Sequence, residues 1–240
     1  MRTQREEKIP QAFSEMYRDR IYSNRGNAAL IELVRNGDGC TFLDVGCGAG
    51  GNAVLLRQRF NTATICGVTM SSSEAEVAKP FFDELYIADI QDSRIFVPTK
   101  PLDGIIFSHV LEHLIDPEEV LRRACKWLKP TGRVYIALPN VLFYQQRVRM
   151  MLGSFEYTRE GLMDETHLRF YTWRSARALI ERSGLVVEEQ NAIGSIPLRP
   201  MRKFIPQICT GLDRVFTKCF PNLFGFHILI RARMRTQIAK

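Results

Sequence analysis

Short apolar runs alternate with segments of helical periodicity through the middle of the chain. The runs, rich in β-branched and other apolar residues as in buried strands, are at 41–46, 64–69, 84–89, 103–110 and 132–140. The segments between them with apolar residues at helical spacing are 52–60, 72–82 and 116–128. This alternation predicts an α/β fold with a Rossmann-like, doubly wound and mostly parallel sheet, covered by helices on both faces.

The same patterns extend the fold toward both ends. Residues from about 9 to 35 have helical spacing in two pieces that break near 22–27. Near the C-terminus, a helix over 173–184 precedes apolar runs at 185–190 and 226–234. These two runs bring the expected number of strands to seven.

Composition places the chain among soluble globular proteins, with 45% hydrophobic and 25% charged residues. Its six cysteines form no C-x-x-C pair and no zinc spacing, and the N-terminus is charged where a secretory signal would be apolar. No run of eighteen apolar residues occurs, so no membrane-spanning helix is expected. We therefore expect reduced thiols and a cytoplasmic location.

The net charge of +7 is concentrated near the C-terminus. Residues 195–240 contain nine Lys or Arg against one acid, Asp213, a balance of +8, whereas 1–194 contain 24 basic and 25 acidic residues, a balance of −1. Such a basic tail attracts phosphate groups on a membrane surface or on an acidic substrate, although a solvated surface is an equal alternative. We expect a peripheral membrane contact through it, or a homodimer through its apolar, proline-punctuated parts.

A glycine-rich loop follows the first predicted strand. Gly46-x-Gly48-x-x-Gly51 formally satisfies the dinucleotide-binding pattern, which alone is weak evidence. Asp44 precedes the loop, and an acid there opposes the pyrophosphate of a dinucleotide. The second strand ends on Thr69, where a dinucleotide fold places an acid on the ribose.

S-adenosylmethionine fits these charges better, because it carries an ammonium and a sulfonium and no phosphate. Asp44 then lies near the ammonium or braces the loop around it. Thr69 would give one neutral hydrogen bond, worth about 0.5–1.5 kcal/mol, where a charge-assisted bond contributes about 1.5–3 kcal/mol. We therefore expect modest cofactor affinity, and tighter binding after Thr69→Asp.

Four segments in order, "LDVGCGAGGN", "IADI", "FSHVLEHLIDP" and "LKPTGRVYIALPN", resemble the class I S-adenosylmethionine-dependent methyltransferases. The resemblance covers roughly 40–191. The arrangement of "VLEHLIDP", "PNV" and "GLMDETHLRFYT" is similar to that of the branch that modifies sugars, glycans and quinone-type hydroxyls.

The resemblance implies a set of cofactor-binding residues. The methionine and ribose side is implied to consist of Asp44, Gly46, Cys47, Gly48 and Gly50. The remaining positions are implied to be Thr69 and Met70 at the ribose and adenine, Asp89 and Ile90 at the adenine, and Ser108 under the methionine. The plainer alternatives are that Cys47 is merely small enough for a tight loop and that Asp89 only ends a strand.

No linker divides the chain, so a single domain over 1–240 is expected. Its parts are N-terminal helices at 1–38, a cofactor-binding core at 39–140, an insertion at 141–172 and a C-terminal part with the basic tail at 173–240. The insertion is too long for a simple strand-to-helix loop, so we expect a partly helical, aromatic lid over the site.

A hydroxyl acceptor needs a base, and a histidine suits neutral pH. His167, which closes the insertion, is the first candidate, and His109, at the end of the fourth strand, is the second; a reaction with neither is the alternative. His113 and His227 are expected to be structural. No metal site is expected, and a metal-assisted route through the adjacent Glu112 and His113 is the lesser option, because no further ligand stands at a familiar spacing.

Aromatic and basic side chains are frequent in the insertion. The aromatic ones could stack on a sugar or an aromatic ring, or form the insertion's own core. They are Tyr144, Phe155, Tyr157, Phe170, Tyr171 and Trp173. Arg147, Arg149 and Arg159 could hold a phosphate or carboxylate, which favours an anionic or lipid-linked glycan acceptor.

The leading hypothesis is an S-adenosylmethionine-dependent O-methyltransferase for a hydroxyl of a sugar, glycan or lipid-linked precursor. A methyltransferase for a small aromatic, lipid or natural-product acceptor is the alternative. Hypotheses of another class are a nucleotide-binding oxidoreductase, disfavoured by Asp44 and Thr69, and a non-catalytic cofactor-binding module. Nucleic acid is disfavoured because aromatic and basic residues do not interleave and no Asn/Asp-Pro-Pro-Tyr-like motif occurs.

Overall fold

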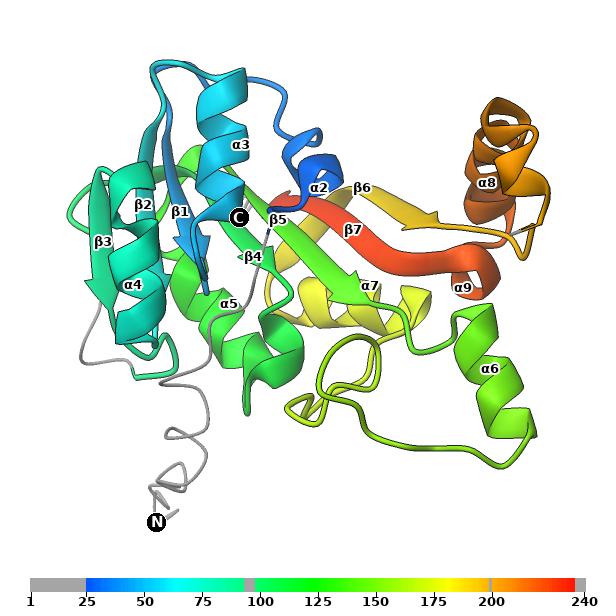
Figure 1. Cartoon of the computed structure of the whole chain (residues 1–240). Coiled ribbons are helices and arrows are strands. Elements are labelled where there is room, and N and C mark those ends of the chain that lie inside the picture. The colour runs from blue at the N-terminus through cyan, green and yellow to red at the C-terminus, as the bar shows by residue number, and fades with distance from the viewer. Residues whose placement is uncertain (1–24, 93–97, 199, 236–240) are drawn as a thin grey trace, which may run out of the picture.

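A seven-stranded sheet forms the centre of the molecule (Figure 1), with the order β3-β2-β1-β4-β5-β7-β6. The computed structural model describes residues 25–92, 98–198 and 200–235. The strands are β1 (Thr41–Val45), β2 (Thr64–Thr69), β3 (Glu84–Ile87), β4 (Leu102–Ser108), β5 (Leu128–Pro139), β6 (Leu185–Gly194) and β7 (Gly225–Met234). Strands β1 to β5 pair in parallel and β7 pairs antiparallel with β5 and β6. The predicted Rossmann-like, mostly parallel sheet is confirmed.

Helices cover both faces of this sheet, as the sequence predicts. They are α2 (Ala28–Ile31), α3 (Gly51–Arg59), α4 (Ser72–Ala78), α5 (Pro117–Cys125), α6 (Tyr144–Met151), α7 (Trp173–Arg182), α8 (Pro206–Cys219) and α9 (Pro221–Phe224), with short 3-10 turns η1 (Lys79–Phe81), η2 (Leu111–His113) and η3 (Met201–Lys203). One buried cluster packs α5 and α7 against the sheet, and a second packs α2 and α3. Burial of these two apolar layers stabilises the fold.

The topology places the site at one edge of the sheet. Going outward from β1, the chain runs through β2 and β3 on one side and through β4 and β5 on the other. In doubly wound sheets, ligands bind at this switch point, beyond the carboxyl ends of the strands. The glycine loop after β1 and the η2 turn after β4 both lie there.

Two helix predictions differ from the structure. Of the two helical pieces expected over about 9–35, the first lies outside the described residues and stays a prediction. The second, expected over 27–35, is wrong in length, because α2 ends at Ile31. The Ile31 carbonyl accepts from the Arg59 side chain (2.9 Å) and from the Val34 amide (3.0 Å), so a tight turn replaces the next helical turn. The helix expected over 116–128 ends at Cys125, because Leu128 begins β5.

The C-terminal part contains a helix that the sequence analysis did not predict. Between β6 and β7 the chain leaves the sheet, and α8 stands out from the body at the upper right of Figure 1. Asp213 faces inward from α8, accepts from the Ile196 amide (2.9 Å) and pairs with Arg202 (2.6 Å). Within the described ranges, no helix is both long and apolar enough to cross a bilayer.

Candidate active site

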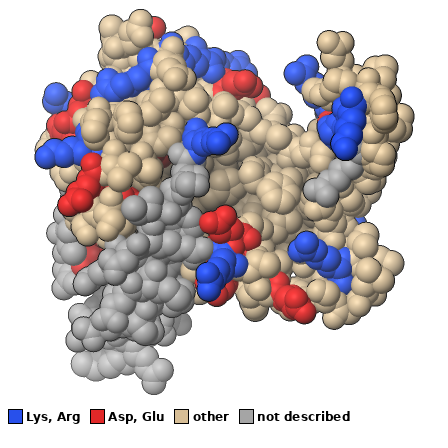
Figure 2. Space-filling model, in the orientation of Figure 1, with Lys and Arg blue, Asp and Glu red and all other residues tan. Residues whose placement is uncertain are grey.

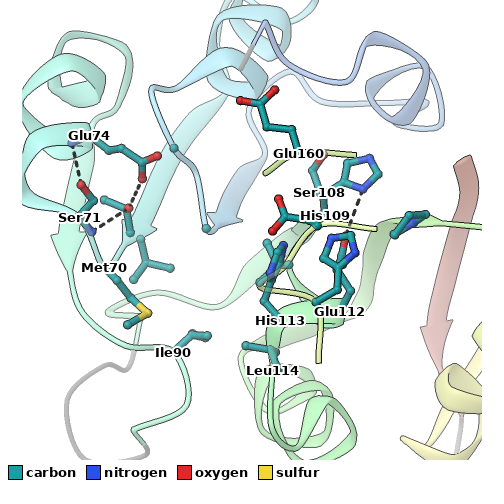
Figure 3. Close-up of a pocket in the computed structure, with 18 of the residues that line it drawn as sticks. Met70, Ser71, Glu74, Ile90, Ser108, His109, Glu112, His113, Leu114 and Glu160 are labelled. Atoms are coloured by element: carbon teal, nitrogen blue, oxygen red, sulfur yellow. Dashed lines mark hydrogen bonds and ion pairs between the residues drawn. The ribbon is translucent and has the colours of Figure 1, made fainter. Parts of the chain in front are cut away.

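A cavity of about 560 Å³ opens at the carboxyl edge of the sheet (Figure 3). Its walls come from the loops after β1, β2, β3 and β4, from the insertion at 160–167, and from Phe226 and His227 of β7. In Figure 3, Met70, Ser71 and Glu74 lie on one side, and His109, Glu112 and His113 lie on the other. The cavity therefore has a side under the glycine loop and a side under the insertion.

Most of the residues expected at the site line this cavity. They are Gly46, Gly48, Thr69, Met70, Asp89, Ile90, Ser108, His109 and His167. Three others lie behind the wall: Asp44 is fully buried on β1, the Cys47 amide donates to the Val68 carbonyl (3.1 Å), and Gly50 caps α3.

The glycine loop needs glycine for its backbone. Gly46 has φ 63° and Gly48 has φ 52°, in the left-handed region that other residues rarely adopt. A Cβ at Gly46 would also lie 2.7 Å from the Val110 side chain. The absence of side chains lets the loop backbone itself form the cavity wall.

The Asp44 carboxyl group is fully buried beneath this loop. Burial raises its pKa to about 7, although a hydrogen bond from the Asn52 amide (3.2 Å to Oδ1) acts in the opposite direction. Its Oδ2 has no hydrogen-bond partner among the described residues. A cation nearby would favour the ionised carboxylate and offset its desolvation, so this residue fits the ammonium of S-adenosylmethionine.

Glu74 is a site residue that the sequence analysis missed. The Thr69 hydroxyl donates to Glu74 Oε2 (2.8 Å), and Glu74 is only 6% exposed while it lines the cavity. The acid expected at the end of β2 is thus supplied by the first turn of α4. Ser71 accepts from the Glu74 amide (3.2 Å), and the Ser-x-x-Glu spacing of a capping box could have placed this carboxylate beside the strand end.

The charge of the walls separates the two kinds of nucleotide cofactor. Five acids line the cavity: Glu74, Asp89, Glu112, Glu160 and Asp164. Within the described ranges, no Lys or Arg lines it. Such a surface attracts a cationic ligand and repels a pyrophosphate. The cavity therefore fits S-adenosylmethionine and disfavours a dinucleotide.

Glu112 organises the side under the insertion. It is fully buried on η2, and its Oε1 accepts from His109 Nδ1 (3.2 Å). Burial disfavours its ionisation, but the hydrogen bond from His109 and the positive potential of His109 and His113 together hold its pKa below the usual value. Its carbonyl accepts from the amides of Leu168 (2.9 Å) and Arg169 (3.1 Å), which fixes the end of the insertion beside the site.

His167, far away in sequence, meets this cluster. Atoms of Glu112, His113 and His167 that can coordinate a metal lie within 4.8 Å of one another, so the three residues could hold a divalent cation. His167 is the third candidate metal ligand that the sequence spacing did not show. His167 Nδ1 donates to the Leu162 carbonyl (3.2 Å), which leaves Nε2 as the basic nitrogen. Burial lowers the pKa of His167, so the ring is neutral at physiological pH.

His109 is held in a strained position at the end of β4. Among the described residues, His109 is the one non-glycine residue with a positive φ (58°). Its amide donates to the Ala137 carbonyl (3.0 Å). Its ring lies 4.5 Å from that of His227, whose pKa burial lowers to about 3. His227 is therefore neutral; it was expected to be structural, but it lines the cavity.

The acceptor-binding residues expected in the insertion do not line the cavity. Arg147 donates to the Leu142 carbonyl (2.7 Å), and neither Arg149 nor Arg159 belongs to the walls. The rings of Phe155 and Tyr157 lie 6.0 Å apart and pack on each other. Because Phe155 is 52% exposed and Tyr157 is 56% exposed, the pair is not a buried core, and the structure shows neither of the two roles expected for these rings.

Comparison with known proteins agrees with this geometry. A family model described as a methyltransferase domain matches residues 10–190. Ubiquinone biosynthesis O-methyltransferase from Rhodopseudomonas palustris (strain TIE-1) is 28% identical over 179 residues, which cover 71% of this chain and 68% of that protein. Trans-aconitate 2-methyltransferase from Azoarcus sp. (strain BH72) is 29% identical over 111 residues, which cover 46% of this chain and 44% of that protein.

Solved structures show the same fold. An S-adenosylmethionine-dependent methyltransferase from Archaeoglobus fulgidus superposes with a TM-score of 0.60 at 19% identity, over 94% of this chain and 100% of that chain. The family match covers the glycine loop, the five acids of the cavity wall and the insertion. The chain therefore belongs to the methyltransferase domain family and is an enzyme that takes its methyl group from S-adenosylmethionine.

Proposed function

We propose that the enzyme methylates a hydroxyl oxygen on an acceptor that is neutral where it enters the cavity, a sugar or glycan hydroxyl, including that of a lipid-linked precursor. The observation that carries this proposal is the cavity wall, which combines five acids with a neutral histidine and, among the described residues, no Lys or Arg. The relatives named as O-methyltransferases support an oxygen acceptor.

On the side under the glycine loop, the residues would hold the cofactor. Glu74, with Thr69 beside it, would accept from the ribose hydroxyls, and Asp89 would accept from the adenine amino group. Asp44 would stabilise the ammonium from beneath the loop. S-adenosylmethionine supplies an electrophilic methyl group on its sulfonium. The chain mainly has to align the acceptor oxygen with it and exclude water.

On the opposite side, His167 would act as the general base. Its Nδ1 is committed to Leu162, so Nε2 would accept the hydroxyl proton as the oxygen is methylated. Glu112 would stabilise the resulting imidazolium, since its carboxylate is buried in the same cluster. His109 would orient Glu112 through their hydrogen bond.

The same cluster supports a second mechanism. Glu112, His113 and His167 would hold a divalent cation, which would supply Lewis-acid chemistry that makes an acceptor hydroxyl more acidic. A chelator separates the two mechanisms. Activity that survives extensive treatment with EDTA supports His167 as the base, and activity restored only by added Mg²⁺ or Mn²⁺ supports the metal.

The proposal is tested with matched acceptors. The enzyme is incubated with S-adenosylmethionine and with pairs of acceptors that present the same hydroxyl with or without an adjacent phosphate or carboxylate. Neutral members should be preferred, because the acidic walls oppose a second anion. A small aromatic hydroxyl, such as a catechol, tests the alternative acceptor class. Product spectra should show an O-methyl ether. Methylation only at nitrogen or carbon, or only of the anionic members, would contradict the proposal.

A further inference from the structure

Helix α8 has two faces of different character. Its inner face carries Cys209, Asp213 and Thr217, which are buried against the β6 side of the body. The outer face carries Ile208, Leu212 and Val215, followed by Cys219; positions at this spacing share one side of a helix. Ile208 and Val215 are each 58% exposed.

The exposed apolar surface continues beyond the helix. Phe204, just before α8, is 84% exposed, and Phe220, just after it, is 55% exposed. An aromatic ring so fully in water is costly for an isolated monomer. The apolar outer face of α8 and these two exposed rings at its ends are together called the α8 strip here.

A row of cations runs beside the α8 strip. Lys203, Arg214 and Lys218 are exposed, and Arg214 and Lys218 are one helical turn apart. Figure 2 shows cationic side chains on the α8 projection at its upper right. The acid of this helix, Asp213, faces inward and pairs with Arg202, so it does not neutralise the row. An apolar strip with a cationic flank is the pattern of a helix that lies in a membrane interface.

We propose that α8 docks this methyltransferase on an anionic lipid bilayer, with the α8 strip in the boundary between headgroups and acyl chains and its cations on lipid phosphates. A second copy of the chain fits this surface less well. Packing two strips against each other would bring Lys203, Arg214 and Lys218 of both copies together, with no exposed acid on either helix to compensate.

A series of aromatic contacts connects α8 with the cavity wall. The Phe216 ring of α8 lies 5.5 Å from that of Phe224, and Phe224 lies 6.2 Å from Tyr144 of α6. Phe143, next in this series, lies 5.2 Å from Phe226, which lines the cavity. The inference concerns binding alone and does not depend on the proposed acceptor; if both hold, the acceptor is presented at a membrane.

The first test compares apolar substitutions. The full chain is sedimented with vesicles of phosphatidylcholine alone or mixed with phosphatidylglycerol, with no cofactor or acceptor present. Wild type should bind the anionic vesicles and lose this binding at high salt. Val215→Asp should weaken binding by about tenfold, because it removes the burial of one apolar side chain. Val77→Asp on α4 is the control, since Val77 is also an exposed helical valine (48%).

The second test compares charges. The double variant Lys203→Glu/Lys218→Glu should weaken binding by at least about 25-fold, because each change removes a cation worth about fivefold near the surface and adds a carboxylate that the anionic lipids repel. The control is the double variant Lys79→Glu/Lys126→Glu, which changes the net charge equally at exposed lysines of η1 and the end of α5. It should bind the vesicles nearly as well as the wild type. Folding of each variant is checked by its binding of S-adenosylhomocysteine, because none of the substituted residues lines the cavity.

Three results would overturn the inference. Wild type could sediment equally with neutral and anionic vesicles, or the control variants could lose as much binding as the α8 variants. Wild type could also form a dimer that Val215→Asp dissociates, in which case the α8 strip is a subunit interface. If the wild type binds anionic vesicles but does not methylate the proposed acceptors, the proposed function is refuted and this inference stands.

Discussion

Glu74 gives the sharpest test of how the site binds its cofactor. The change is Glu74→Gln, which keeps the size and hydrogen-bonding shape of the side chain and removes its charge. Glu74 Oε2 accepts from Thr69, and a Cβ placed on Gly48 would lie 3.6 Å from Oε1, so the carboxylate sits between the end of β2 and the glycine loop. This is where the ribose hydroxyls should lie.

The expected size follows from the kind of hydrogen bond. A charge-assisted bond contributes about 1.5–3 kcal/mol and a neutral bond about 0.5–1.5 kcal/mol. Because the amide oxygen of glutamine can still accept, the loss is the difference, about 1–1.5 kcal/mol, which raises the Kd for S-adenosylhomocysteine about 5- to 13-fold. Isothermal titration calorimetry measures this directly.

A matched control lies on the same helix. Glu76→Gln removes the same charge from an exposed position on α4 and should leave the Kd unchanged. An unchanged Kd for Glu74→Gln, with the fold intact, would show that Glu74 does not contact the cofactor. Equal losses in both variants would mean that the general charge of α4 is responsible.

The structure also reverses one expectation from the sequence. Thr69→Asp was expected to tighten binding by restoring a missing acid. However, the Thr69 hydroxyl already lies 2.8 Å from the buried Glu74 carboxylate, so a second carboxylate there would add like-charge repulsion. We now expect weaker binding of S-adenosylhomocysteine by this variant, and tighter binding in the same titration would show that Glu74 is not the ribose acid.

Further predictions concern the catalytic side, pH and the loop. His167→Ala should lower kcat by about 10²–10⁴ with KM little changed, and the kcat of wild type should fall only below the depressed pKa of His167; a kcat that is unaffected excludes it as base. Cofactor affinity should rise as pH increases through about 7, because Asp44 ionises there, and Asp44→Asn should abolish this rise in calorimetry. Gly46→Ala should lower Tm by several degrees in a thermal melt, because of its φ of 63° and the 2.7 Å contact with Val110; an unchanged Tm would mean that the loop can relax.

The central sheet could be predicted from the sequence because parallel strands are buried on both faces. The resulting continuous apolar runs stand out from the amphipathic helices between them. The helix α8 was not predicted, because Gly211 lies in its interior and its exposed face is as apolar as a core face. Periodicity reports which residues share a side and not whether that side meets protein or water.

The candidate site was predictable mainly where the sheet topology brings the ends of strands together. The glycine loop and Ser108 lie at strand ends, so their convergence follows from topology. Glu74 was not predicted, because this acid lies in the first turn of α4 and not at the end of β2, where the acid was expected. The meeting of His167 with Glu112 depends on how the insertion folds back, and no local pattern encodes it.

The most direct test of the account is a calorimetric titration of the purified full chain with S-adenosylmethionine and S-adenosylhomocysteine, with NAD as the parallel ligand. An acidic cavity beneath a glycine loop should bind the two phosphate-free nucleosides in the micromolar range and give no heat with NAD. Binding of NAD without binding of S-adenosylhomocysteine would contradict the roles given to Asp44 and Glu74, and with them the assignment of the cavity.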